Sequence, residues 1–296
     1  MSRTKEEKAA RKRQARAEIR EQPVLFSVYL ILRICVLAVL IIQIFNQNYE
    51  SVLICLLTLV LFLIPSFVER QLHIDLPNTL EVIILFFIFA AEILGEIQEY
   101  YLIFPQWDTI LHTTNGFLMA AIGFSLVDIL NRSNRFRLRL SPIFVAVVAF
   151  CFSMTVGVLW EFFEFGADNL IHTDMQKDTV VQSVTSVLFN PEGHNRAETI
   201  PIESIVVNGE RWEYGGYIDI GLYDTMEDLF VNFIGALAFS IIGFFYIKGR
   251  GKGKFARRFI PRLKADELPG SASSEFFEPV PIGTEPEEDP APAEPN

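Results

Sequence analysis

The chain has 296 residues, of which 51% are hydrophobic, and its mean hydropathy is +0.32. Hydrophobicity at this level, gathered into long runs, excludes a single soluble core and indicates several bilayer spans. The net charge of −11 is an average over strongly segregated charges, and we expect membrane lipids, not nucleic acid, as partners. The three cysteines, Cys35, Cys55 and Cys151, lie inside apolar runs without metal-ligand spacing. We interpret them as small buried hydrophobic residues.

Residues 1–22 form a charged head rich in Lys and Arg, which we expect to lie as a helix on the membrane surface. The apolar run that follows is too long for a signal peptide and has no small-residue cleavage site, so it predicts a retained anchor. Each apolar run has close to the ~20 residues that a bilayer core requires. The sequence predicts an all-α membrane domain over 23–247 with six spans, at about 24–45, 51–68, 80–98, 107–130, 142–166 and 222–247.

The basic residues of the loops predict the orientation, because Lys and Arg resist translocation. Residues 46–50 and 99–106 contain no Lys or Arg, and 167–221 is acidic. Basic residues instead follow the second, fourth and sixth spans: Arg70; Arg132, Arg135, Arg137 and Arg139; Lys248, Arg250, Lys252, Lys254, Arg257 and Arg258. Only six spans with both termini in the cytoplasm place all of these segments inside.

The connection 167–221 between the fifth and sixth spans is expected to form a small extracytoplasmic cap. Residues 200–207, the Asn208-Gly209 pair and residues 210–214 predict a β-hairpin with a type I′ turn, which Gly215-Gly216 ends. The C-terminal tail, 248–296, is first basic and then acidic and rich in Pro. We expect this tail to be disordered, because it cannot bury enough apolar surface to order itself.

Polar residues inside the spans form four stripes at helical spacing, each toward the outer end of its helix. Intramembrane charge is costly, so these side chains are expected to face the bundle interior or a water-filled cavity. Adjacent carboxylates also repel unless they share a proton or a cation. The stripes are Glu92, Glu96 and Glu99; Asp108, His112 and Asn115; Glu161, Glu164 and Asp168; and Asp224, Asp228 and Asn232.

One imidazole and several carboxylates form a ligand set suited to Zn, Mn or Fe, and the same groups suit general acid–base catalysis or proton transfer. The catalytic candidates are Glu161, Glu164, His112, Asp108 and Asp228. The candidates for a divalent metal are His112, Glu161, Glu164, Asp224 and Asp228. Glu92, Glu96, Asn115, Asp168 and Asn232 are assigned to a wider polar network.

A structural interpretation stands beside the functional one. Glu99, Asp108, Asp168 and Asp224 lie within a turn of a predicted helix end, where they can act as solvated caps. For Asp108 and Asp224 the positive N-terminal end of the helix dipole also favours an anion. Trp107 and Trp160 suit an aromatic belt at the outer interface.

Four local motifs carry a resemblance to a known family. Residues 107–112 with Gly116-Phe117 resemble a W-D-x-x-L-H…G-F segment, and 157–164 resemble G-x-x-W-E-x-x-E. Residues 174–176 resemble N-M-Q, with Asp in the first place, and 224–229 with Gly235-Ala236 resemble D-T-M-x-D-L…G-A. These motifs, in this order over about residues 80–247, are similar to those of the YjdF-like (DUF2238) family of bacterial inner-membrane proteins, whose function is unknown. The family is also distantly similar to VanZ-like membrane proteins, which carry a D-K-x-x-H element and are associated with glycopeptide resistance.

The resemblance implies a multi-pass protein of the bacterial plasma membrane but no reaction. We therefore hold three functions open: an intramembrane enzyme or binding site, with or without a metal, for an envelope or lipid-linked substrate; a proton- or ion-coupled transporter; and a non-catalytic scaffold. A transporter would need polar groups through the inner half of the bundle, where only Arg33 and Asp128 carry charge. Oligomeric state and substrate are not specified by the sequence.

Overall fold

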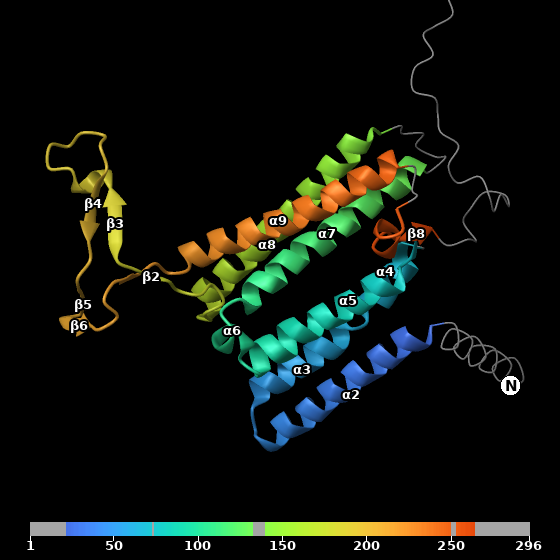
Figure 1. The fold of residues 1–296 in the computed structure, drawn as a ribbon. Coiled ribbons are helices and arrows are strands. Elements are labelled where there is room, and N and C mark those ends of the chain that lie inside the picture. The colour runs from blue at the N-terminus through green and yellow to red at the C-terminus, as the bar shows by residue number, and fades with distance from the viewer. Residues whose placement is uncertain (1–21, 73, 133–139, 250–252, 264–296) are drawn as a thin grey trace, which may run out of the picture.

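The computed structural model describes residues 22–72, 74–132, 140–249 and 253–263 (Figure 1). The predictions for the charged head up to residue 21, for the arginines at 135–139 and for the acidic end of the tail therefore lie outside the described residues. The described part is mainly helical. Its helices form two neighbouring groups, one from the N-terminal half of the chain and one from the C-terminal half.

The first group begins with α2 (Pro23–Phe45), whose first turn contains a proline at a position without an intrahelical N–H partner. After a short turn, the Asn48 side chain accepts a hydrogen bond of 3.1 Å from the Ser51 backbone N–H and caps α3 (Tyr49–Leu61). The chain then continues as α4 (Ile64–Leu72). The predicted span 51–68 is therefore two consecutive helices, which together cover Tyr49–Gln71.

The predicted span 80–98 differs from a regular α-helix. It is built from α5 (Asn78–Phe89, 12 residues) followed directly by η1, a π-helix over Ala90–Ile97 of 8 residues. In a π-helix the backbone bonds run from residue i to i+5, so the α-helical spacing used to group Glu92, Glu96 and Glu99 does not hold here. Glu99 lies beyond η1 in a left-handed backbone conformation, at the start of the one-turn helix α6 (Tyr100–Ile103).

The second group consists of three long helices that pack along most of their length (Figure 1). These are α7 (Trp107–Arg132), α8 (Pro142–Ile171) and α9 (Leu222–Lys248). The Ser141 hydroxyl accepts a hydrogen bond from the Phe144 backbone N–H at the start of α8. α8 runs five residues beyond its predicted end at 166, so more of the predicted loop 167–221 is helical than the hydropathy pattern indicates.

Glycines allow α7, α8 and α9 to approach closely. A Cβ atom on Gly116 would collide with the Asn232 backbone carbonyl, and one on Gly235 with the backbone carbonyl of Thr113. A Cβ atom on Gly157 would meet the side-chain amide of Asn232. Small residues at such crossings are the usual basis of helix packing within membranes, and here they bring the polar stripes of three helices together.

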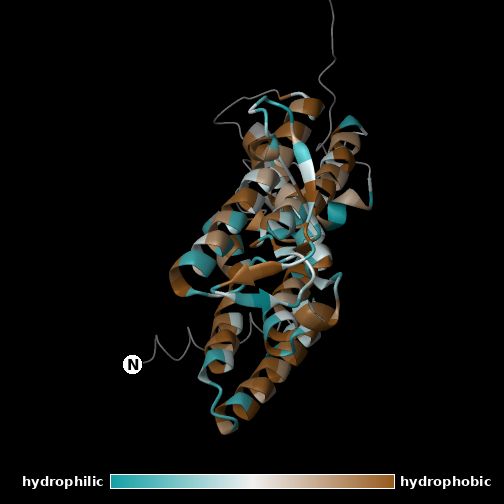
Figure 2. Ribbon diagram, turned by 90° about the vertical axis from the view of Figure 1, so that its left-hand side faces the viewer, coloured by the Kyte–Doolittle hydropathy of each residue, from teal (hydrophilic) through white to brown (hydrophobic). Residues whose placement is uncertain are grey.

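Five helices are long and apolar enough to cross a membrane by length and composition: Pro23–Phe45, Tyr49–Gln71, Trp107–Asp128, Pro142–Ile171 and Leu222–Lys248. Hydrophobic residues cover most of the helical ribbons (Figure 2). Many large ones are exposed, among them Phe45 at 81% and Phe162 at 67%. Cys35 and Cys151 also lie on this outer surface, so the prediction that they are buried is wrong, and only Cys55 is buried. This apolar surface is the one expected of a protein that crosses a bilayer.

The fold is not purely α-helical, because residues 180–218 form small antiparallel sheets beyond one end of the long helices (Figure 1). β2 (Val180–Val181) pairs with β7 (Tyr217–Ile218). β3 (Ser183–Ser186), which is followed by a 3-10 turn at Val187–Phe189, pairs with β4 (Glu198–Pro201). β5 (Ile205–Val207) pairs with β6 (Glu210–Trp212).

The hairpin predicted at Asn208-Gly209 is present but shorter than expected. Asn208 and Gly209 have φ angles of 55° and 90°, as a type I′ turn requires at both central positions. However, only 205–207 and 210–212 pair around this turn, and residue 200 belongs to β4. Residues 200 and 201, the first part of the predicted strand, instead pair with β3. The local sequence pattern gives no signal of this pairing.

At the opposite end of the bundle, residues 253–263 fold back onto the helices (Figure 1). They contain a 3-10 turn, Ala256–Arg258, and β8 (Arg262–Leu263), which pairs with β1 (Ile74–Asp75). Ala256, Phe259 and Ile260 join the larger hydrophobic core, and the Phe259 ring contacts the Phe117 ring edge to face at a centroid distance of 5.1 Å. This part of the predicted tail is therefore ordered, because its three apolar side chains find a buried site.

Candidate functional site

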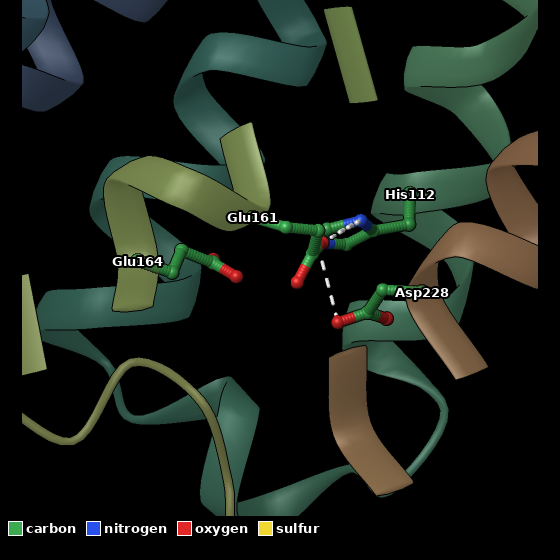
Figure 3. Close-up of side chains that lie close together, drawn as sticks. All are labelled: His112, Glu161, Glu164 and Asp228. Atoms are coloured by element: carbon green, nitrogen blue, oxygen red, sulfur yellow. Dashed lines mark ion pairs between the residues drawn. The ribbon is translucent and has the colours of Figure 1, made fainter. Parts of the chain in front are cut away.

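Three helices bring four of the predicted site residues into one buried group (Figure 3). α7 supplies His112, α8 supplies Glu161 and Glu164, and α9 supplies Asp228. One nitrogen or oxygen atom from each of these residues lies within 4.8 Å of those from the others. All four side chains are buried, with exposures between 3% and 8%. We call these residues the central group.

The imidazole of His112 lies between carboxylates from all three helices (Figure 3). Its Nδ1 atom is 3.9 Å from Glu161 Oε1. Its Nε2 atom is 3.7 Å from Asp228 Oδ2 and 3.6 Å from Asp108 Oδ1. These distances are longer than hydrogen bonds, so the ring has carboxylate oxygens on both sides without close contact to any of them.

The carboxylates of the central group keep oxygens without a hydrogen-bond partner. Glu161 Oε2, Glu164 Oε2 and Asp228 Oδ2 are buried and have no hydrogen-bond partner in the described part of the chain. The other oxygen of Glu164 accepts a hydrogen bond of 2.8 Å from Trp160 Nε1, which fixes the orientation of this side chain. Buried polar atoms are normally paired, so three unpaired oxygens around one imidazole are the pattern expected of a site that binds something.

A second group of carboxylates shares a residue with the first. Asp108, Asp224 and Asp228 also have oxygens within 4.8 Å of one another. Asp108 and Asp224 lie in the first turns of α7 and α9, whose N-terminal ends carry partial positive charge and favour anions. The Lys177 backbone N–H donates a 2.8 Å hydrogen bond to Asp224 Oδ2, so Asp224 is both a helix-end residue and part of a ligand-like group.

The chain that leaves α8 covers the site at the start of α9. Asp168 accepts hydrogen bonds from the backbone N–H groups of Met175 and Gln176 and from the Thr173 hydroxyl, at 2.7–2.8 Å. The buried Gln176 side chain in turn donates to Thr225 Oγ1 on α9 at 2.6 Å. Asp168 therefore has an indirect role: its hydrogen bonds hold the turn that places Gln176 and Lys177 over the start of α9.

Further along α7 and α9, an amide pair closes the site. Asn115 Nδ2 donates to Asn232 Oδ1 at 3.4 Å, and Asn232 Nδ2 lies 3.6 Å from Met154 Sδ. The Ser153 hydroxyl donates to the Gly116 carbonyl at 2.8 Å. Asn115 and Asn232 therefore connect the three helices next to the central group, and neither belongs to it.

Glu92 and Glu96 belong to neither group of carboxylates. Glu92 is half-buried and Glu96 is exposed, and both are carried by the π-helix η1. Asp108 and Lys177 are among the charges that act on Glu96, so Glu96 lies close to the site although it belongs to neither group. Glu99 is exposed as well, in agreement with the interpretation as a solvated residue at a helix end.

Sequence reasoning did not assign Trp160, Gln176 or Thr225 to the site. Trp160 is 43% exposed, as an interfacial tryptophan should be, but its N–H also binds Glu164. The i, i+4 spacing of Trp160 and Glu164 on one helix was a usable signal. Gln176 and Thr225 could not be found in this way, because their contact joins a loop to a helix 49 residues further along the chain.

The fold and this site define a class: a multi-helix membrane protein with a buried imidazole–carboxylate site at one end of its helix bundle. A sequence model described as "Predicted membrane protein (DUF2238)" matches residues 28–249. The chain therefore belongs to the DUF2238 family. The match begins earlier than the four motifs do and includes the loop between α8 and α9. No curated protein and no solved structure matches the chain, so the distant similarity to VanZ-like proteins stays a prediction.

Proposed function

We propose that this protein is a membrane enzyme that holds a divalent metal ion between His112, Glu161, Glu164 and Asp228 and acts on an envelope or lipid-linked substrate. The observation that supports the proposal most directly is the convergence of these four buried side chains from three helices. One imidazole with three carboxylates suits Zn, Mn or Fe. An ion held there would polarise a substrate oxygen or activate a bound water.

The unpaired carboxylate oxygens favour a cation over a purely structural network. Burial of an unpaired carboxylate is strongly unfavourable, and the described residues provide no Lys or Arg side chain in an ion pair with this group. A transporter is less favoured, because the bundle beyond the amide pair is filled by Leu118, Ala121, Phe124 and Phe239. Among the described residues of this region, Ser125, Asp128 and Ser240 are the buried polar side chains, so polar groups are fewer here than in the central group.

The proposal is tested by the metal content of the full-length protein purified in detergent. We expect at least one equivalent of Zn, Mn or Fe per chain by elemental analysis. His112→Ala and Glu161→Gln should lose most of this metal, because each removes a ligand from the group. Glu227→Gln is the matched control, since Glu227 is exposed, precedes Asp228 on the same helix and belongs to neither group. Metal-free wild-type protein that also fails to take up added Zn²⁺, Mn²⁺ or Fe²⁺ would refute the metal site.

We also propose that the chain crosses the bacterial plasma membrane six times, with α5 and η1 together as the third crossing and both termini in the cytoplasm. Arg70 on α4 and Lys248 on α9 lie near the end of the molecule where β8 pairs with β1, and the acidic loop lies beyond the other end. The positive-inside rule then places the candidate site toward the outer face.

Reporter fusions test this orientation. Alkaline phosphatase, which is active only outside the cytoplasm, should be active when fused after Pro105 or Pro191 and inactive when fused after Pro77 or Gly249. The Pro77 and Pro105 fusions isolate the contribution of α5 and η1, since they differ only by this segment and the short α6. Equal activity of the Pro77 and Pro105 fusions would show that α5 and η1 do not cross the membrane. An active fusion after Gly249 would place the C-terminal end of α9 outside the cytoplasm.

A further inference from the structure

Asp228 is the residue where the two groups of carboxylates meet. It belongs to the central group with His112 and to the second group with Asp108 and Asp224. It lies one helical turn after Asp224 on α9, so the two side chains point to the same side of the helix. A carboxylate has two oxygens, and Asp228 can therefore face one group with each of them.

The charge of the combined site is too large for one divalent ion. Five carboxylates meet here: Asp108, Glu161, Glu164, Asp224 and Asp228. The nearby Lys177 ammonium group is paired with Asp174, and the N-terminal ends of α7 and α9 each contribute only about half a positive charge. With all five carboxylates ionised, a single divalent cation leaves about two negative charges unbalanced, whereas two cations nearly neutralise the site.

One observation independent of charge points to a ligand beside the second group, and a second shows that the group is held in place. Asp228 is only 3% exposed, and its Oδ2 atom has no hydrogen-bond partner among the described residues. This oxygen lies 3.7 Å from His112 Nε2, the same atom that Asp108 Oδ1 approaches to 3.6 Å, so it lies where the two groups join. Asp224 is held in place by the Lys177 backbone N–H, which belongs to the loop that covers the site. The second group is thus held partly in place by a backbone contact that involves Asp224 and neither Asp108 nor Asp228.

We propose that the site holds two divalent cations that share Asp228: one in the central group and a second between Asp108, Asp224 and Asp228. This inference rests on the proposed function, because the first cation is the one assigned there. The two positions differ in chemistry. The central group includes an imidazole nitrogen, whereas the second group offers oxygen alone and therefore suits a hard cation such as Mg²⁺ or Mn²⁺.

The test is metal stoichiometry, with Mn²⁺ as the probe. Full-length protein in detergent is stripped with chelator, loaded with Mn²⁺, desalted and analysed for Mn per chain. The paramagnetic resonance spectrum is recorded in parallel. We expect two Mn²⁺ per wild-type chain, with the exchange coupling of a bridged pair, and two in the Glu227→Gln control. Asp224→Asn and Asp108→Asn should each retain one uncoupled Mn²⁺, and Asp228→Asn should retain less than one.

Glu164→Gln gives the reciprocal case, with the central cation lost and the second retained. Variants are compared only as monodisperse protein by size exclusion, and the use of both Asp108→Asn and Asp224→Asn covers the case that one does not fold. One Mn²⁺ in the wild type that both aspartate variants keep would overturn the second cation and leave the proposed function intact. Two Mn²⁺ that persist in both variants would place the second ion elsewhere and equally overturn the inference. No Mn²⁺ in the wild type would refute both proposals.

Discussion

Adding Mn²⁺ or Zn²⁺ to chelator-treated protein is expected to raise its free energy of unfolding by about 2.7 kcal/mol when the free metal concentration is one hundred times Kd. The reason is linkage: the ion binds the folded site, where His112, Glu161, Glu164 and Asp228 converge, and not the separated helices. The measurement is the thermal unfolding temperature in detergent as a function of metal concentration. Absence of a metal-dependent rise in the wild type would contradict a metal site.

The order of the unfolding temperatures of the Glu161→Gln variant and the wild type should reverse when metal is added. Without metal, an amide in place of this buried, unpaired carboxylate relieves repulsion from Glu164 and Asp228, so the variant should unfold at a higher temperature than the chelated wild type. With saturating metal, the wild type should be the more stable protein. The exposed Glu227→Gln control should follow the wild type under both conditions. If Glu161→Gln is less stable than the wild type with and without metal, Glu161 has a structural role only.

The Gly235→Ala variant is expected to lose about 1–3 kcal/mol of stability. The new methyl group would collide with the Thr113 carbonyl on α7, and backbone cannot move away as a flexible side chain can. The helices α7 and α9 would separate, and with them His112 and Asp228. We therefore expect a lower unfolding temperature in detergent together with a reduced metal content.

Gly166→Ala is the matched control for this prediction. Gly166 also lies in a long helix, α8, but a Cβ atom there has no neighbour within 4 Å. Since alanine is favoured over glycine in a helix by about 1 kcal/mol, this variant should be unchanged or slightly more stable. Similar unfolding temperatures for Gly235→Ala and the wild type would show that the close helix crossing is not required.

The polar stripes show how far spacing alone can predict a site. On α7, α8 and α9 the i, i+3 and i+4 spacing held, and the deeper residues His112, Glu161 and Asp228 do lie together. On the third predicted span it did not, because the backbone changes to a π-helix at Ala90. A π-helix has no strong sequence signal, so the α-helical spacing that grouped Glu92 and Glu96 with Glu99 does not apply there. Their assignment to a wider polar network stays a prediction.

The cover of the site shows a different limit. The 174–176 motif marked a segment of interest, but its role depends on Asp168 binding the Met175 and Gln176 backbone and on Gln176 reaching Thr225. Loop contacts of this kind have no periodicity. Residues 253–263 show the same limit of local patterns. This short segment is ordered because Phe259 packs into the larger hydrophobic core, a contact between segments far apart in the chain.

The sequence by itself determined the membrane class, the positions of the long helices and the residue types of the candidate site, because hydropathy and helical spacing are local properties of the chain. The tertiary structure alone decided which polar residues meet, that Asp228 is shared by two groups, and which oxygens remain unpaired. Those outcomes depend on how closely α7, α8 and α9 approach at Gly116, Gly157 and Gly235, and that distance is set by packing between segments far apart in the chain.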